Sequence, residues 1–259
     1  MPVNEGHARG AHKGSLARFE VQPIKIKKKD SKKYAHIEPP LPKPPLAVTV
    51  LARRRQGKST VVVNLLMNGG YIKAFSEIII LSETIDNDRT YSPLSKFDNV
   101  FVHDIKKHPI DNELLEAIWE RQKQRYKEDR NNDLLIVFDD LGNKMKSKEM
   151  RAWMNRYAQL SRHPGISYIN CVQSILNCTS EQISNTTTWI IFSLDQRALT
   201  RVSETLATAE MDRKQLEKYI KVNTEKKHSW IMVNLEAESD DLVYTAYDPV
   251  TNSFSKGVR

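Results

Sequence analysis

Residues 46–60 read LAVTVLARRRQGKST, and the fold is decided by this stretch. Its first six residues are apolar or β-branched, which is typical of a buried strand. The residues from Lys58 onward predict a helix over 58–67, which ends at the NGG of residues 68–70. The sequence therefore predicts a strand, a short loop and a helix in direct succession, with Gly57 where the loop becomes the helix.

The loop matches the phosphate-binding motif GxxxxGK[ST] at its last three positions and has Ala52 in place of the first Gly. Backbone N–H groups at a helix N-terminus cradle phosphate, Lys58 would neutralise the β and γ oxygens, and the Ser59 hydroxyl would reach Mg²⁺. Ala52 fits the first position if its φ is negative. The alternative is a surface loop with a coincidental GKS. The residues predicted to bind ATP are Ala52, Arg53, Arg54, Arg55, Gln56, Gly57, Lys58, Ser59 and Thr60.

A second apolar run, LLIVF at residues 134–138, ends in Asp139 and Asp140. In phosphate-loop NTPases, a carboxylate at such a strand tip holds Mg²⁺ and the next acidic residue can act as the base toward water. We therefore expect Asp139 to join Ser59 in binding the metal, and Asp140 to be the catalytic base. An acidic pair after a strand is also common in turns and helix caps. The order of the two motifs along the chain favours the catalytic interpretation.

A third candidate is Gln173, at the end of a strand predicted over 165–173. A polar residue at this tip can sense the γ-phosphate of a nucleotide or position the attacking water. An ordinary strand-end Gln is the alternative. The polar stretch 83–91, after the second predicted strand, is typical of a nucleotide-edge or pore loop, and the sequence does not decide between these.

Strands and helices alternate along most of the chain, which predicts a parallel sheet. Further strands are expected over 77–81, 99–103 and 188–193, and helices over 111–128 and 147–161. The last part predicts helices over 196–206 and 212–221, then an antiparallel hairpin formed by 229–235 and 242–247. The predicted fold class is α/β, with a mostly parallel central sheet flanked by helices and a C-terminal antiparallel extension.

The net charge of +8 is concentrated at the N-terminus, where residues 1–45 contain ten Lys or Arg against four Asp or Glu. The sequence EPPLPKPPL at residues 38–46 predicts a stiff, extended linker. We therefore expect a basic, flexible arm and linker over 1–45 and a folded domain over 46–259, with its core at 46–200 and its helices and hairpin at 201–250. Such an arm suits a polyanion, a nuclear-import signal or a solvated tail.

The composition excludes several classes of protein. With 39% hydrophobic and 28% charged residues in 259, the chain is expected to fold, and wholly disordered or collagen-like classes are excluded. No apolar run reaches the roughly 20 residues of a membrane helix, and the N-terminus lacks the apolar segment of a signal peptide. We expect a soluble, intracellular protein with no membrane partner. The two cysteines form neither a disulfide framework nor, alone, a zinc site.

The succession ARRRQGKSTVV, IIILSETIDNDRTY, LLIVFDD and SRHPGISYINCVQ resembles the viral DNA-packaging ATPases of the FtsK/HerA superfamily, in particular the poxvirus-type group. The resemblance covers residues 46 to about 200. It implies an additional-strand, RecA-like P-loop ATPase that forms a homo-oligomeric ring, a pentamer or hexamer. Such a ring uses ATP and Mg²⁺ to drive double-stranded DNA into a preformed capsid. A capsid or portal protein is then a partner, and the virus assembly site in the host cell, and also the virion, are the expected locations.

The resemblance also implies an arginine finger, for which two residues are candidates. Arg162, shortly before the Gln173 strand, is similar to a family arginine that would act in trans on a neighbouring subunit, with Arg156 in reserve. The triple arginine of the loop resembles large terminases of tailed phages, in which Arg54 would act in cis. A surface salt bridge is the alternative for each.

The motifs favour an ATP-driven DNA translocase for genome packaging over three alternatives. A HerA-like translocase or helicase not dedicated to packaging would share every motif. A small-substrate phosphotransferase would need a lid and an acceptor-binding set of arginines. A non-catalytic nucleic-acid-binding or capsid-binding protein would leave the acidic pair and Gln173 unexplained.

Overall fold

A computed structural model describes residues 33–83, 89–141, 144, 147–208, 211–237, 243–248 and 253–255. Residues 1–32, most of the predicted arm, lie outside this description, as do residues 84–88 of the polar stretch. The described chain is built on one nine-stranded sheet of order β3-β2-β4-β5-β1-β6-β7-β8-β9. The strands are β1 (Ala47–Leu51), β2 (Glu77–Ser82), β3 (Val100–Asp104), β4 (Leu134–Asp139), β5 (Ile166–Val172), β6 (Thr188–Phe192), β7 (Trp230–Asn234), β8 (Tyr244–Asp248) and β9 (Ser253–Ser255).

The first six strands are parallel and the last three extend the sheet antiparallel, which confirms the predicted fold class. β5 pairs with β1 on one side and with β4 on the other, so one strand separates β1, which leads into the predicted phosphate loop, from the acidic strand β4. This is the additional-strand arrangement. Because the strands are parallel, Leu51, Asp139 and Val172 all lie at the same, carboxyl-terminal edge of the sheet.

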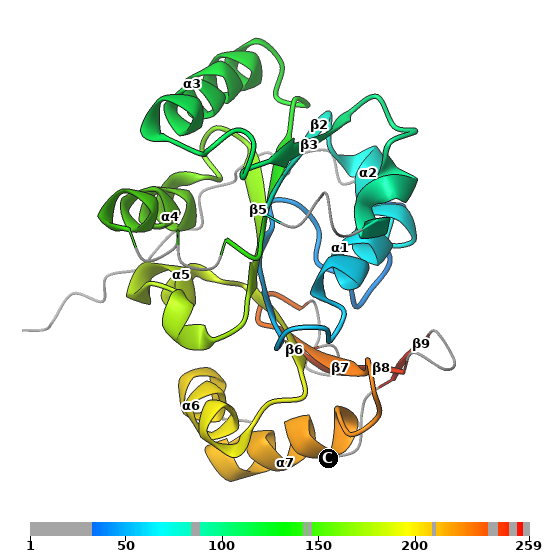
Figure 1. The fold of residues 1–259 in the computed structure, drawn as a ribbon. Coiled ribbons are helices and arrows are strands. Elements are labelled where there is room, and N and C mark those ends of the chain that lie inside the picture. Colours follow the sequence, from blue (N-terminus) through cyan, green and yellow to red (C-terminus); the bar gives the residue numbers. More distant parts are fainter. Residues whose placement is uncertain are drawn as a thin grey trace, which may run out of the picture. The chain divides into compact units, whose positions relative to one another are not determined.

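Helices cover both faces of the sheet (Figure 1). One face carries α1 (Lys58–Met67), α2 (Tyr71–Ala74) and the 3₁₀ helix η2 (Arg89–Leu94). The other carries α3 (Asn112–Glu128), α4 (Lys148–Leu160), α5 (Ser180–Asn185), α6 (Gln196–Leu206) and α7 (Arg213–Asn223). Asp111, Ser147, Asp195 and Asp212 cap α3, α4, α6 and α7, because each side chain accepts a hydrogen bond from a backbone N–H of the first turn. No helix in the described ranges has the length and apolar character needed to cross a bilayer.

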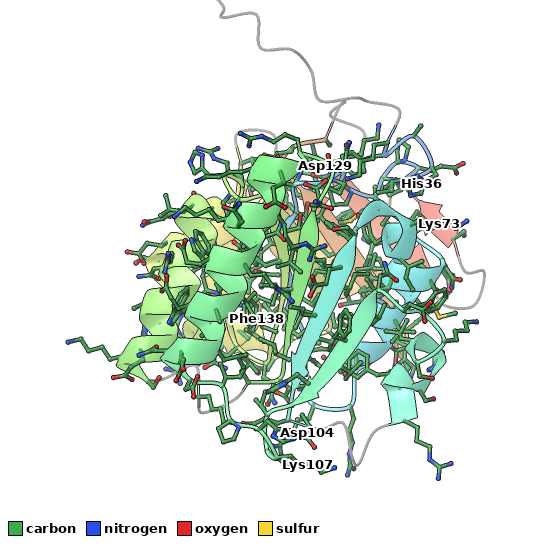
Figure 2. The ribbon with its side chains drawn as sticks, turned by 90° about the horizontal axis from the view of Figure 1, so that it is seen from above. His36, Lys73, Asp104, Lys107, Asp129 and Phe138 are labelled. Carbon is green, nitrogen blue, oxygen red and sulfur yellow. The ribbon has the colours of Figure 1, made fainter. Side chains whose placement is uncertain are left out.

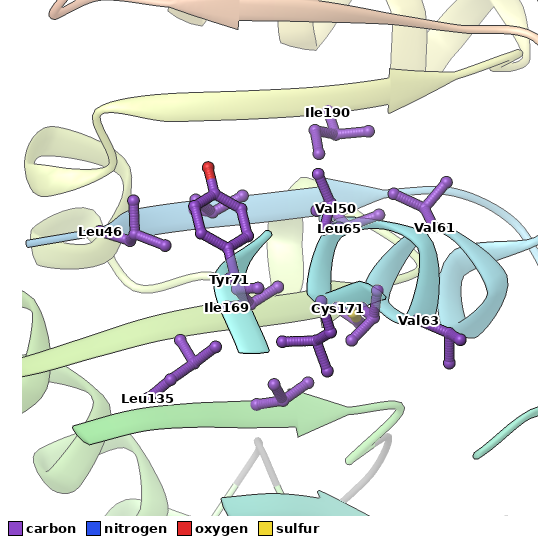
Figure 3. Packing of buried hydrophobic residues seen from close by; sticks show 14 of the residues in the cluster. Leu46, Val50, Val61, Val63, Leu65, Tyr71, Leu135, Ile169, Cys171 and Ile190 are labelled. Carbon is purple, nitrogen blue, oxygen red and sulfur yellow. The ribbon is translucent and has the colours of Figure 1, made fainter. Parts of the chain in front are cut away.

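The layer between α1 and the sheet holds the helix in place over the loop. Val61 and Leu65 of α1 pack against Val50, Ile169 and Ile190 of three neighbouring strands (Figure 3). Burying each such side chain contributes roughly 1.5–3 kcal/mol. The contact fixes the N-terminus of α1 above the carboxyl end of β1.

Five short elements were not predicted: α2, η2, the 3₁₀ helix η4 (Ile175–Asn177), α5 and β9. Each has six residues or fewer, too few to show a hydrophobic period. A signal for α5 is present, because Thr179 and Gln182 form a capping box at its start.

The folded part begins earlier than predicted. Tyr34 and Ile37 are 5% and 1% exposed and belong to the core beneath α1. The Tyr34 hydroxyl donates to the Asp133 carboxylate, and Lys33 Nζ reaches the same carboxylate at 2.7 Å. This segment lies at the amino-terminal end of the parallel strands. Asp104 marks the carboxyl end of β3, and Figure 2 shows His36 at the opposite end of the molecule from Asp104. The predicted boundary at residue 46 is therefore wrong, since two apolar residues in a basic stretch give no local signal of burial.

We expect Ile37→Ala to lower the free energy of unfolding by about 2–4 kcal/mol, because it leaves a cavity in the core. Urea unfolding followed by circular dichroism measures this. Ile37→Val, which removes one methyl group, should cost about 1 kcal/mol. An unchanged midpoint for Ile37→Ala would mean that residues 33–45 are a detached linker after all.

Candidate active site

The loop after β1 continues the sheet for one residue and then takes two left-handed backbone conformations before α1 begins. The Ala52 N–H donates to the Val172 carbonyl at 3.1 Å, so the pairing with β5 continues one residue beyond the strand. Arg55 and Gly57 have φ of 63° and 104°, whereas Ala52 is not among the described residues with positive φ. The condition for Ala52 at the first motif position is therefore met. The left-handed conformation at Gly57 suits a residue without a Cβ.

Lys58 opens α1 and its ammonium group lies inside the curve of the loop. The side chain is 7% exposed, and Nζ donates to the carbonyls of Ala52 at 3.2 Å and Arg53 at 3.3 Å. The positive end of the α1 dipole lies at the same point. A helix N-terminus and a buried ammonium together favour an anion here.

Ser59 and Asp139 meet at the edge of the sheet, as predicted for two metal-binding residues. Ser59 Oγ donates to Asp139 Oδ2 at 2.9 Å, and Tyr91 in η2 donates to the same oxygen at 2.6 Å. Asp139 is fully buried, and its other oxygen, Oδ1, has no hydrogen-bond partner among the described residues. An unpartnered carboxylate oxygen beside a hydroxyl fits Mg²⁺, which binds one or two protein oxygens together with phosphate oxygens.

Burial raises the pKa of Asp139 above its ordinary value, because the charged form loses its hydration. The hydrogen bonds from Tyr91 and Ser59 and the charge of Lys58 act in the opposite direction. Tyr91, Ser59 and Lys58 therefore favour the ionised, metal-binding form of Asp139, whereas burial and the negative charge of the neighbouring Asp140 raise its pKa. In the described chain, no three His, Cys, Asp or Glu side chains cluster closely enough to hold an ion by themselves.

Asp140 and Gln173 are brought together by the pairing of β4 with β5. Gln173 Nε2 donates to Asp140 Oδ1 at 2.6 Å. Asp140 has a φ of 51°, a left-handed conformation that Asp tolerates better than most residues. The turn that follows β4 thus places a second, half-buried carboxylate beside a strand-end amide. A carboxylate and an amide in contact form a unit that can hold and deprotonate a water molecule.

The remaining loop residues have separate places. Gln56 ties the loop to β6, because Oε1 accepts from the Arg53 N–H at 2.7 Å and Nε2 donates to the Ser193 carbonyl at 2.9 Å. Arg54 and Thr60 are exposed. Arg54 therefore lies in the loop of its own site with its side chain at the surface.

The structure does not bring Arg162 to this site. It is exposed and lies in the turn between α4 and β5, at the amino-terminal end of a strand of seven residues, or about 20 Å. Only a neighbouring subunit could present Arg162 to a site at the other end. Arg156, by contrast, pairs with Glu116 at 2.8 Å and lies over the rings of Trp119 and Trp153, as expected for a structural salt bridge.

Sequence reasoning missed Tyr91. Its side chain is 4% exposed and it is separated from Asp139 by 48 positions, so no local pattern joins them. The signal was indirect: the polar stretch 83–91, singled out as a nucleotide-edge or pore loop, ends at this residue.

The fold and the site define a P-loop NTPase of the additional-strand class. The family model described as Poxvirus A32 protein matches residues 40–250, and the chain belongs to this family. The membership confirms the resemblance drawn from the motifs. No curated protein matches the chain.

Solved structures share the fold at low sequence identity. The DNA-packaging ATPase B204 from Sulfolobus Turreted Icosahedral Virus is 15% identical, with a TM-score of 0.58 over 79% of this chain and 98% of that chain. The genome packaging NTPase B204 from Sulfolobus turreted icosahedral virus 2, in complex with ATP-gammaS, is 14% identical, with a TM-score of 0.53 over 78% and 96%. The cytoplasmic domain of the Type VII secretion ATPase EccC from Thermomonospora curvata is 10% identical, with a TM-score of 0.53 over 72% and 24%.

We expect Tyr91→Phe to move the acid limb of the Mg²⁺-dependent ATPase profile to higher pH. The hydroxyl stabilises the ionised form of Asp139, so its removal raises the pKa of Asp139 further, and activity is lost earlier as the pH falls. Steady-state rates between pH 5 and 9 measure this, and Mg²⁺ titrations should show weaker metal binding at the acid end.

Tyr71→Phe is the matched control, because the Tyr71 hydroxyl donates to the Pro42 carbonyl, away from the site. It should leave the acid limb where it is. Coincident profiles for Tyr91→Phe and the wild type would show that Tyr91 does not act on Asp139.

Proposed function

We propose that this protein hydrolyses ATP with Mg²⁺ and uses the energy to drive double-stranded DNA into a viral capsid. The observation that carries the proposal is the hydrogen bond between Ser59 and Asp139, which joins the loop motif to the acidic motif across the sheet. Lys58 at the same point and the Asp140–Gln173 pair beside it supply the remaining parts of an ATPase site. Membership of the poxvirus A32 family supports packaging as the use of that energy, as do relatives described as a DNA-packaging ATPase and a genome packaging NTPase.

The chain's own residues divide the chemistry as follows. The N-terminus of α1 and the Lys58 ammonium bind the phosphates and stabilise negative charge on them. Bound Mg²⁺, held by Ser59 and Asp139, would neutralise the charge that develops on the phosphate oxygens. Asp140 accepts a proton from the attacking water, and Gln173 fixes the carboxylate that does so. ATP is thereby converted to ADP and phosphate.

The geometry of the site argues against the alternative that the loop is degenerate and the protein is not a catalyst. A chain without nucleotide chemistry would have no reason to hold a fully buried carboxylate with an unpartnered oxygen, because such a group destabilises the fold. The two DNA-translocase alternatives share one site and differ only in whether a capsid or portal protein is a partner. For the packaging motor we propose such a partner, and the host-cell assembly site as its location.

We propose a homo-oligomeric ring, a pentamer or hexamer, on family resemblance. Arg162 lies before β5, whereas the proposed site of the same subunit lies after β5. If Arg162 is the arginine finger, it therefore acts on the site of a neighbouring subunit, which supports the proposed ring. Arg54 would instead complete the site of its own subunit. The two assignments predict different behaviour of mixed assemblies.

We expect Lys58→Ala and Asp140→Asn to abolish ATP hydrolysis while leaving the fold intact. Loss of a general base lowers rates by about 10²–10⁴. Phosphate release in the presence of duplex DNA measures the effect. Lys123→Ala and Asp129→Asn make the same changes at exposed positions remote from the site and should retain activity. Turnover at the wild-type rate in both site variants would end the proposal.

We expect the Arg162→Ala variant to regain activity when it is mixed with Lys58→Ala subunits. Removal of an arginine finger lowers rates by about 10³–10⁵. Because Lys58→Ala subunits keep Arg162, they can supply the finger to a neighbour whose own site is intact. The readout is ATPase rate against the mixing ratio. If Arg54 is the finger, Arg54→Ala is inactive and no mixture restores it, whereas Arg162→Ala alone stays active.

A further inference from the structure

Four aromatic side chains form a row across the antiparallel extension of the sheet. Phe192 of β6 lies opposite Trp230 of β7, Trp230 opposite Tyr247 of β8, and Tyr247 opposite Phe254 of β9. Trp230 and Tyr247 are stacked with ring centroids 4.7 Å apart, and Phe254 meets them edge-on at 5.5 and 5.6 Å. We call this row the aromatic ladder. All four residues lie on the face of the sheet that α1 covers.

A cleft of about 490 Å³ separates the ladder from α1. Its far wall is one side of the helix, including Thr60, Val61 and Asn64, and Gly57 of the phosphate loop is part of its lining. The volume is within the range of small-molecule sites, about 300–1,000 Å³. The cleft is therefore an apolar, ring-lined space that is continuous with the phosphate loop.

The cleft lies on the side of the loop away from the metal-binding carboxylate. β4 and β5, with Asp139 and Gln173, flank β1 on one side, whereas β6 to β9 extend from the other. Ser59 and Asp139 would hold a metal that neutralises the terminal phosphates, which places the phosphate end of the ligand on the side of β4 and β5. The nucleoside end of the same ligand must then leave the loop toward β6, where the ladder begins.

We propose that this cleft binds the base of the nucleotide, stacked against the aromatic ladder. The inference rests on the proposed function, since it assumes that phosphates bind at Lys58 and Ser59. Phe192 and Trp230 are 2% and 4% exposed, so the half-buried rings of Tyr247 and Phe254 carry the surface that a planar base would contact. Gln56, whose carbonyl lies 3.1 Å from His228 Nδ1, joins the rim of the cleft to the loop. Base binding is thereby linked to the antiparallel extension, which motif analysis left without a role.

The test compares ADP with pyrophosphate, a probe that has the phosphates and lacks the nucleoside. Asn64 is exposed on α1 at the rim of the cleft, so Asn64→Trp fills the cleft without removing a core side chain. We expect ADP to bind this variant at least roughly tenfold more weakly, from the loss of base stacking. Pyrophosphate affinity should stay at the wild-type value. Gln124→Trp, on an exposed part of α3 on the other face of the sheet, is the matched control and should change neither affinity.

A second measurement uses the ladder itself and does not depend on filling the cleft. ADP should change the fluorescence of Trp230 and pyrophosphate should not. Trp230→Phe removes the indole that reports binding, so the ADP-dependent fluorescence change should be absent from this variant. The other three tryptophans serve as the unchanged background.

The outcomes separate the cleft from the site as a whole. If pyrophosphate binds normally and ADP binds Asn64→Trp as tightly as the wild type, the base does not use the cleft and the inference is overturned, while the proposed function stands. A signal that persists in Trp230→Phe overturns it as well. If neither ADP nor pyrophosphate binds the wild type, the proposed function and the inference fail together.

Discussion

The buried carboxylate of Asp139 is the constraint on which the site depends. It ends β4, a strand whose six residues are all buried, so the charge lies at the rim of the hydrophobic core. Desolvating a charge is costly unless other groups solvate it. Here Ser59, Tyr91 and Lys58 do so, and each comes from an element packed on the α1 face of the sheet. The positions of α1 over β1 and of η2 beside it therefore do two things: they bury apolar side chains, and they bring Ser59, Lys58 and Tyr91 to the Asp139 carboxylate.

The sheet order assigns different tasks to the two sides of the phosphate loop. On the side of β5 and β4 lie the groups suited to metal binding and proton transfer, Asp139, Asp140 and Gln173. On the side of β6 lies a wall of aromatic rings. Neighbouring strands lie about 4.8 Å apart, so the polar groups on β4 and β5 and the aromatic rings that begin on β6 lie on opposite sides of β1 and are well separated. A nucleotide has the same polarity, with charge at one end and a flat ring at the other.

The opposite end of the sheet serves stability and, in the proposed ring, assembly. Residues 33–45 are held there by Tyr34 and Lys33 on Asp133, and Ile37 enters the core beneath α1. Arg162 lies in a turn at this same amino-terminal edge. The proposed arginine finger in trans would thus come from the edge of one subunit and act at the opposite edge of the next. Such head-to-tail contacts form a ring when the rotation from one subunit to the next closes.

The sequence by itself determined those parts of the site whose residues are adjacent along the chain. A phosphate loop is one strand, one turn and one helix start, so Gly57, Lys58 and Ser59 identify it without knowledge of the fold, and an apolar run ending in Asp139 identifies its partner strand. The alternation of these elements also predicted the parallel sheet and its antiparallel extension, whereas elements of six residues or fewer gave no period to detect. Only the tertiary structure decided that Tyr91 reaches Asp139, that Tyr34 reaches Asp133 across 99 positions, and that Phe192, Trp230, Tyr247 and Phe254 form one wall. In these cases the partners are distant along the chain, and their contacts follow from strand register and helix packing, which no local pattern of residues encodes.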